Sequence, residues 1–162
     1  MKNILLIITA IAAIFMAACT EDNDGEKEAI NKGVCIVLLD KDSTDLLDPD
    51  NPNGYKFSEM GLYEDLDLKQ KRLAGWQLVA EMNCFNNSDI KLYYGIAFHA
   101  PMDYKIKRDG ETIWYATSYL KLNQTTVDTV YTEVTETAHS LKLRNVLYNG
   151  VDITTNYFVV IK

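Results

Sequence analysis

The sequence predicts an all-β protein, with a single antiparallel β-sandwich over residues 33–162. Short runs of β-branched and aromatic residues recur along this part of the chain, and clusters of turn-forming residues separate them. Two dipeptides typical of tight hairpin turns, Asp109-Gly110 and Asn149-Gly150, each lie between two such runs. No segment has the convincing amphipathic spacing that a surface helix shows. These observations together favour a sandwich of short strands.

The first predicted strand is Gly33–Leu39, a β-branched run that is apolar on both faces and so is expected to be buried. A loop follows over Asp40–Gly54, which contains two of the three prolines and many turn formers. Asp65–Arg72 fits either a helical turn or a further strand. The other predicted strands are Met60–Tyr63, Gln77–Phe85, Lys91–His99, Thr117–Leu122, Thr126–Thr135, Leu141–Tyr148 and Tyr157–Ile161.

A two-residue turn at 109 and 110 also predicts the register of the first hairpin. Three facing pairs then match in charge or in apolar character: Arg108 with Glu111, Ile106 with Ile113, and Tyr104 with Tyr115. Tyr104 and Tyr115 share a face, Trp114 lies on the opposite one, and Tyr119 follows at a strand-compatible interval. Aromatic platforms bind sugars and peptides, but the strand propensity of tyrosine favours ordinary sandwich packing here.

Residues 1–18 have the layout of a secretory signal peptide. Lys2 precedes an apolar run that is too short for a permanent membrane span and ends in small residues before Cys19. Residues 16–19, with the sequence MAAC, resemble the lipobox of bacterial lipoproteins, although the usual leucine is replaced by Met16. The resemblance implies that the chain is cut before Cys19 and that this thiol carries the lipid that anchors it to a bilayer.

Residues 19–32 are predicted to be a lipidated, disordered tether, because they are acidic, lack aromatic residues and have almost nothing to bury. Acidic residues directly after the lipidated cysteine also resemble the signal that places lipoproteins of Bacteroides-type bacteria on the cell surface. The alternative is that Glu21, Asp22 and Asp24 only solvate a linker. Both interpretations remain open at this stage.

The charge of the chain argues against nucleic acid as a partner. Its net charge of −7 becomes −8 once residues 1–18, which carry one lysine and no acid, are removed. Such a surface repels phosphate backbones, whose binding requires lysine and arginine. The remaining length fits one domain that needs neither disulfides nor metals to fold.

Cys35 and Cys84 remain after Cys19 is lipidated, and they have two interpretations. An exported protein meets conditions in which a disulfide persists, so the two thiols can form one bridge. Alternatively, Cys35 packs as a small apolar side chain within its strand, and both thiols stay reduced. Spacing alone does not decide between these outcomes.

The loop over residues 40–54 carries many oxygen ligands of the kind that Ca²⁺ prefers. They are supplied by Asp40, Asp42, Asp45, Asp48, Asp50 and Asn53. The spacing does not match an EF-hand, and loops use the same residues because Asp and Asn form Asx-turns. A calcium site and a solvated loop are therefore the two interpretations, with the solvated loop favoured.

No catalytic signature is present in the sequence. The only histidines, His99 and His139, stand outside any recognisable motif, and there is no nucleophile elbow, glycine-rich phosphate loop or paired metal-ligand spacing. Paired carboxylates for glycoside hydrolysis depend on distances that a sequence does not supply. We expect no catalytic residue and no cofactor other than the lipid and the conditional Ca²⁺.

Three segments of the mature chain resemble a group of small lipoproteins of Bacteroides-type bacteria that have immunoglobulin-like or transthyretin-like β-sandwiches. They are TSYLKLNQTTVDTVYTEV at 117–134, LKLRNVLYNG at 141–150 and YFVVIK at 157–162. The resemblance covers about half of the chain and implies a fold and an outer-membrane or cell-surface location. It carries over no catalytic residue.

The expected function is a non-enzymatic binding or adhesion module for a protein or glycan ligand, anchored to the outer membrane. An alternative is a structural or accessory subunit of an outer-membrane or fimbrial assembly, in which Tyr157–Ile161 adds to a neighbour's sheet. A hydrolase of envelope polymers is the third and least favoured hypothesis.

Overall fold

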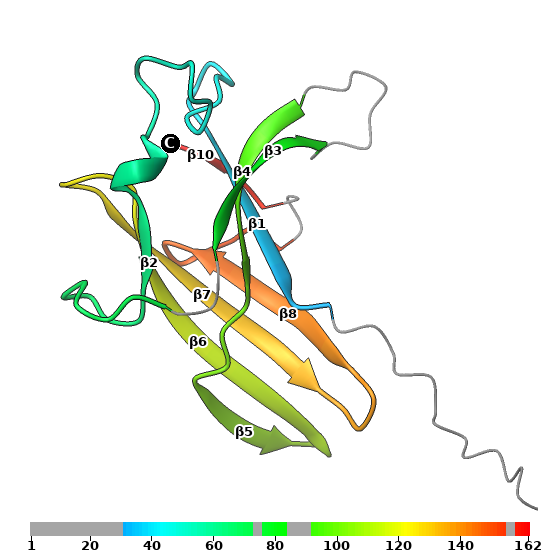
Figure 1. The fold of residues 1–162 in the computed structure, drawn as a ribbon. Coiled ribbons are helices and arrows are strands. Elements are labelled where there is room, and N and C mark those ends of the chain that lie inside the picture. Colours follow the sequence, from blue (N-terminus) through cyan, green and yellow to red (C-terminus); the bar gives the residue numbers. More distant parts are fainter. Residues whose placement is uncertain (1–30, 73–75, 84–91, 155–157) are drawn as a thin grey trace, which may run out of the picture.

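The computed structural model describes residues 31–72, 76–83, 92–154 and 158–162, and it is all-β with two sheets (Figure 1). The predicted signal peptide, Cys19 and most of the predicted tether lie outside the described residues. Within the described ranges, no helix is long and apolar enough to cross a membrane. The prediction of an all-β sandwich is confirmed.

The smaller sheet has the strand order β10-β1-β4-β3. Its strands are β1 (Gly33–Leu39), β3 (Gln77–Asn83), β4 (Leu92–His99) and β10 (Val159–Ile161). β1 runs antiparallel to β4 but parallel to β10. The prediction of a wholly antiparallel sandwich is therefore wrong at this pair. β1 and β10 come from opposite ends of the domain, so no hairpin fixes their relative direction.

The larger sheet has the order β2-β6-β7-β8-β9, and β5 pairs with β6. Its strands are β2 (Gly61–Tyr63), β5 (Tyr104–Arg108), β6 (Glu111–Lys121), β7 (Val127–Glu136), β8 (Leu141–Tyr148) and β9 (Val151–Asp152). The strand that follows the first hairpin turn and the predicted strand Thr117–Leu122 join in β6, which ends at Lys121. No turn former interrupts them, and β7 pairs along the whole of β6. Figure 1 shows β5 to β8 side by side.

Both predicted hairpin turns are confirmed. Asp109 and Gly110 have φ angles of 52° and 86°, and Asn149 and Gly150 have φ angles of 49° and 81°. These left-handed conformations are the ones that a two-residue turn requires. The pairs predicted across the first hairpin are also as observed: Tyr104 with Tyr115, Ile106 with Ile113, and Arg108 with Glu111.

The hydrophobic core lies between the two sheets. It contains Val34, Ile36, Leu38, Ile96 and Phe98 from the smaller sheet and Leu62, Leu120, Val130, Val134, Val146 and Tyr148 from the larger one. Each large side chain buried in this way contributes roughly 1.5–3 kcal/mol to folding. On the opposite side of β1, Val37 and Leu39 pack with Tyr93 and Val159. β1 is therefore apolar on both faces, as predicted.

Two segments outside the strands differ from the sequence predictions. Residues 65–72 form neither a helix nor a strand, because the Asp65 carboxylate accepts hydrogen bonds from the backbone N–H groups of Lys69 and Gln70 and closes a turn. Asn31, predicted to belong to the tether, bonds to β8 through the backbone of Leu141 and Leu143. The contacts of the sandwich thus include residue 31, two positions before the predicted start of the domain. One 3₁₀ turn (η1, Phe57–Glu59) precedes β2.

Candidate binding face

The outer face is the surface of the larger sheet that points away from the core. Side chains alternate along each strand, so Ala116, Ser118 and Leu120 of β6 point inward and are almost completely buried. Tyr115 has the opposite orientation. On β7, Val130 and Val134 are buried, and Tyr131 between them points outward. The same alternation that builds the core therefore places aromatic rings on the outer face.

Three of these rings form what we call the tyrosine row: Tyr104, Tyr115 and Tyr131. The ring centroids of Tyr104 and Tyr115 are 5.3 Å apart with planes inclined by 17°, and those of Tyr115 and Tyr131 are 6.2 Å apart at 31°. Tyr104, on the edge strand β5, is 55% exposed. The rings of the row thus contact one another and form an aromatic surface that solvent reaches at Tyr104.

The hydroxyl of Tyr131 donates a hydrogen bond of 3.1 Å to the carboxylate of Glu133. Partial burial, this bond to a charged acceptor and the neighbouring hydroxyls of Tyr104 and Tyr115 raise the pKa of Tyr131 above its ordinary value. The phenol therefore stays protonated, and its ring orientation is fixed by Glu133.

The ionic cluster, which we define as Glu111, Glu133 and Arg144, lies beside the tyrosine row, since Glu133 is the cross-strand partner of Tyr115. A register shift between β7 and β8 leaves Arg144 as an extra residue on β8. Its guanidinium is 3.8 Å from Glu111 and 3.8 Å from Glu133. Both distances allow an ion pair, and both exceed the length of a hydrogen bond.

Two hollows adjoin the ionic cluster, and Glu111 and Arg144 line both. The first, of about 210 Å³, is completed by Arg108, Asp109 and the buried Ile113. The second has a volume of about 390 Å³. Its remaining walls come from Thr135, Thr137, Ser140, Lys142 and Leu143. The outer face thus combines aromatic rings, charges of both signs and recesses.

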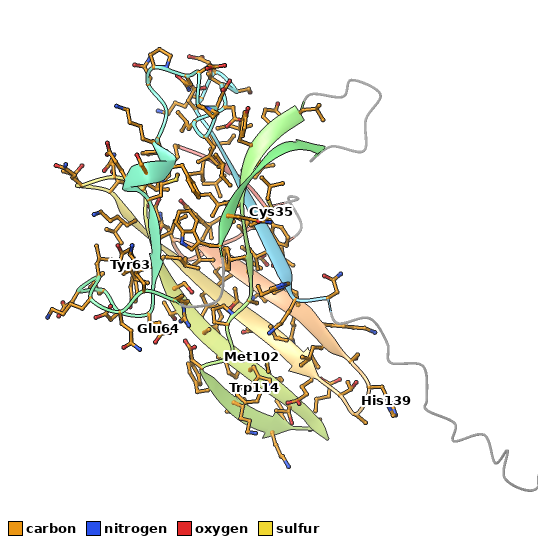
Figure 2. All side chains as sticks on the ribbon, in the orientation of Figure 1. Cys35, Tyr63, Glu64, Met102, Trp114 and His139 are labelled. Carbon is orange, nitrogen blue, oxygen red and sulfur yellow. The ribbon has the colours of Figure 1, made fainter. Side chains whose placement is uncertain are left out.

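Trp114 differs from the tyrosine row, because it packs against the core from the other side of β6. Its indole N–H donates to Glu136 at 2.6 Å, and the ammonium of Lys105 lies 4.7 Å from the ring centroid. The prediction of core packing is confirmed for Trp114, labelled in Figure 2. Tyr104 is not in the core: it stacks on Tyr115 at the edge strand β5, and its ring is 55% exposed.

The aspartates of the predicted calcium loop act mainly on their own backbone. Asp40 accepts hydrogen bonds from the N–H groups of Asp42 and Thr44, Asp45 accepts from Leu47 and from Tyr94 of β4, and Asp48 accepts from Asp50. Within the described parts of the chain, no three His, Cys, Asp or Glu side chains are placed to hold a metal. The calcium site stays a prediction.

The remaining predicted site residues that the structure describes lie on β1, at the end of β4 and in the turn after β7. Cys35 lies in β1 with Ala97 of β4 as its backbone partner, and Cys84 lies outside the described residues, so the predicted bridge is untested. His99 is exposed at the end of β4. His139 is exposed in the turn between β7 and β8, as Figure 2 shows.

A buried carboxylate, Asp128, forms a second polar centre that the sequence analysis missed. It accepts hydrogen bonds from the hydroxyl of Tyr148 at 2.6 Å and the side-chain amide of Asn149 at 2.7 Å, and it pairs with the ammonium of Lys162. Burial by itself would raise the pKa of Asp128, but these donors lower it below its ordinary value. Burial and Asp128 together raise the pKa of Tyr148. We call these four residues the interior hub.

The buried guanidinium of Arg72 joins two strands along the edge of β6. β5 and β2 pair with the same edge and leave Thr117 between them. Arg72 donates to the carbonyl of Thr117 at 2.6 Å and to both carboxylate oxygens of Asp103 at 2.8 and 2.5 Å. The pair therefore closes the gap between the two strands.

Comparisons with family models, with curated proteins and with solved structures found no match to this chain. The account of the site therefore rests on the chain's own residues and their geometry.

Proposed function

We propose that this protein is an exported, lipid-anchored binding module that holds its ligand on the outer face without transforming it. One observation carries the proposal: the tyrosine row is exposed on a rigid sheet and continues into the ionic cluster through Glu133. Aromatic rings with a polar rim are the surfaces that most often dominate binding energy in interfaces.

The rigidity of the sheet supports this proposal. β6 and β7 pair along ten consecutive residues, and β7 continues into β8, so the strands that hold Tyr115, Tyr131 and Glu133 are paired on both sides. Binding then requires little loss of conformational entropy in the protein, because the site is already formed before the ligand arrives.

The predicted N-terminal lipid supports the proposed location at a membrane surface. An acylated Cys19 would hold the sandwich at a bilayer surface. Mass spectrometry of the chain from native membranes tests this part, and an unacylated or uncut N-terminus would remove the anchoring from the proposal.

The binding itself is tested with a pair of matched tyrosine variants. The full chain is screened against glycans and against proteins of the host and of bacteria, and every ligand found is measured again with Tyr104→Ala and Tyr119→Ala. Tyr119 lies on the same strand and face as Tyr115, about 13 Å further along at the usual rise per residue. Loss of ligand binding with Tyr104→Ala but not with Tyr119→Ala supports the proposal. Equal binding by both variants, or a hydrolytic activity on the ligand, would overturn it.

A further inference from the structure

We infer that the outer face binds a neutral oligosaccharide, with sugar rings against the tyrosine row and sugar hydroxyls in the ionic cluster. The inference rests on the proposed function, since it names the ligand class of the same site. The spacing of the charges, their signs and the arrangement of the rings support it.

The spacing of the charges points to hydroxyl groups. Arg144 stands 3.8 Å from an oxygen of Glu111 and 3.8 Å from an oxygen of Glu133, which is too far for a direct hydrogen bond. A group that both donates and accepts fits between a guanidinium and a carboxylate, as a bridging water does. A sugar hydroxyl has this dual capacity, so it can replace such a water without leaving either charge unpaired.

The excess of carboxylates in the ionic cluster argues against an anionic ligand at Arg144. Two carboxylates already face the guanidinium of Arg144, and their side chains are 51% and 21% exposed. A phosphate, sulfate or uronate that approached Arg144 would meet the repulsion of Glu111 and Glu133, in a chain whose net charge is −7. A neutral ligand meets no such repulsion.

The aromatic rings supply the apolar half of the site. Tyr104 and Tyr115 are stacked, and Tyr131 is oriented by its hydrogen bond to Glu133. The C–H faces of a pyranose pack against exposed aromatic rings, here Tyr104 at 55% exposure, and the sugar hydroxyls then lie at the perimeter of the contact, where polar partners are needed. The outer face offers the ionic cluster and its two hollows at this position.

The test uses the full chain in a zwitterionic detergent that carries no sugar. Isothermal titration is performed with linear neutral hexasaccharides of glucose, mannose, galactose and xylose, and with hexagalacturonate as the anionic counterpart. At least one neutral probe is expected to bind, with hexagalacturonate at least tenfold weaker. The affinity for the neutral probe should change less than about twofold between about 50 and about 500 mM salt, because a neutral ligand exchanges no net charge.

Variants then assign the interaction to the outer face. Tyr104→Ala is expected to weaken neutral-probe binding roughly tenfold, whereas Tyr119→Ala leaves it within about twofold. The double substitution Glu111→Gln and Glu133→Gln removes the negative charges beside Arg144. It should strengthen the binding of hexagalacturonate relative to that of the neutral probe. Circular dichroism and a thermal melt of each variant confirm that it is folded.

The outcomes separate the inference from the proposed function. Silence of all neutral probes, or tighter binding of hexagalacturonate by the unmodified chain, overturns the inference. If a protein is the only ligand and Tyr104→Ala abolishes its binding, the proposed function stands and the sugar assignment fails. Neutral-probe binding that Tyr104→Ala leaves intact contradicts both.

Discussion

Two tyrosine–carboxylate pairs in the larger sheet lie in different surroundings. In the interior hub, Tyr148 donates to Asp128, and that carboxylate also receives Asn149 and the ammonium of Lys162. On the outer face, Tyr131 donates to Glu133, and the guanidinium of Arg144 lies 3.8 Å from the same carboxylate. The first carboxylate is 5% exposed with several donors, whereas the second keeps spare hydrogen-bonding capacity at the surface. The same chemical pair is therefore enclosed by donors in one place, and in the other it lies at the surface where we propose that the ligand binds.

Deletion of residues 157–162 should have the largest effect, because it removes Lys162 from the interior hub and β10 from its pairing with β1. Phe158 would also leave its packing against the core. We expect loss of cooperative unfolding, measured by circular dichroism during a thermal scan. A deleted chain that stays soluble and melts as before would instead favour the hypothesis that this strand serves a neighbour's sheet.

Substitution of Asp128 and of Glu133 tests the comparison between the two pairs directly. Asp128→Ala should lower the free energy of unfolding by about 3 kcal/mol, because it leaves a partly buried ammonium and two other donors without their acceptor. Glu133→Ala should cost at most about 1 kcal/mol, as expected of an ion pair near the surface. Urea denaturation of both variants measures the difference, and equal losses would contradict the assigned roles.

Arg72→Met extends the test to another buried ion pair. The substitution removes the donors to Asp103 and to the Thr117 carbonyl, and we expect a loss of about 2 kcal/mol in urea denaturation. Asp103 is 40% exposed and can be hydrated, so the loss should be smaller than for Asp128→Ala. A larger loss would show that strand closure at this edge matters more than the interior hub.

The pH dependence of stability should also follow Asp128. Its pKa is lower in the folded chain than in the unfolded chain, so the ionised form contributes stability above about pH 4, the usual range of a free aspartate. This contribution is lost as the pH falls through the lowered pKa. Asp128→Asn should therefore flatten the decline in unfolding free energy below about pH 4. An unchanged slope would show that other carboxylates control it.

Tyr104→Ala should have the smallest effect on stability, within about 1 kcal/mol, because Tyr104 is more than half exposed and lies on an edge strand. The same variant is the one expected to lose the ligand. A large loss of stability would mean that the tyrosine row is part of the structural framework.

Much of the fold follows from local sequence signals. The hairpins at Asp109-Gly110 and Asn149-Gly150, and the alternation along β7, each need only neighbouring residues for their prediction. The parallel pairing of β1 with β10, and the contact of Asp128 with Lys162, join positions far apart in the sequence, and no local pattern encodes them.

The candidate site was predictable only in part. The sequence placed Tyr104 and Tyr115 on one face of one hairpin but did not show which face meets solvent. Tyr131 joins them only through the register of β6 with β7, and Arg144 reaches the outer face through an irregular pairing of β7 with β8. A tyrosine at an outward-facing position on each of three paired strands, Tyr104, Tyr115 and Tyr131, is the signal that a register prediction would have used.

The most direct measurement is the movement of tyrosine ring signals in NMR spectra while a neutral hexasaccharide that binds is added to the chain. The account predicts that the signals of Tyr104, Tyr115 and Tyr131 shift in a saturable way, while those of Tyr148 do not move. Saturable shifts at Tyr148 with an unchanged tyrosine row would contradict it.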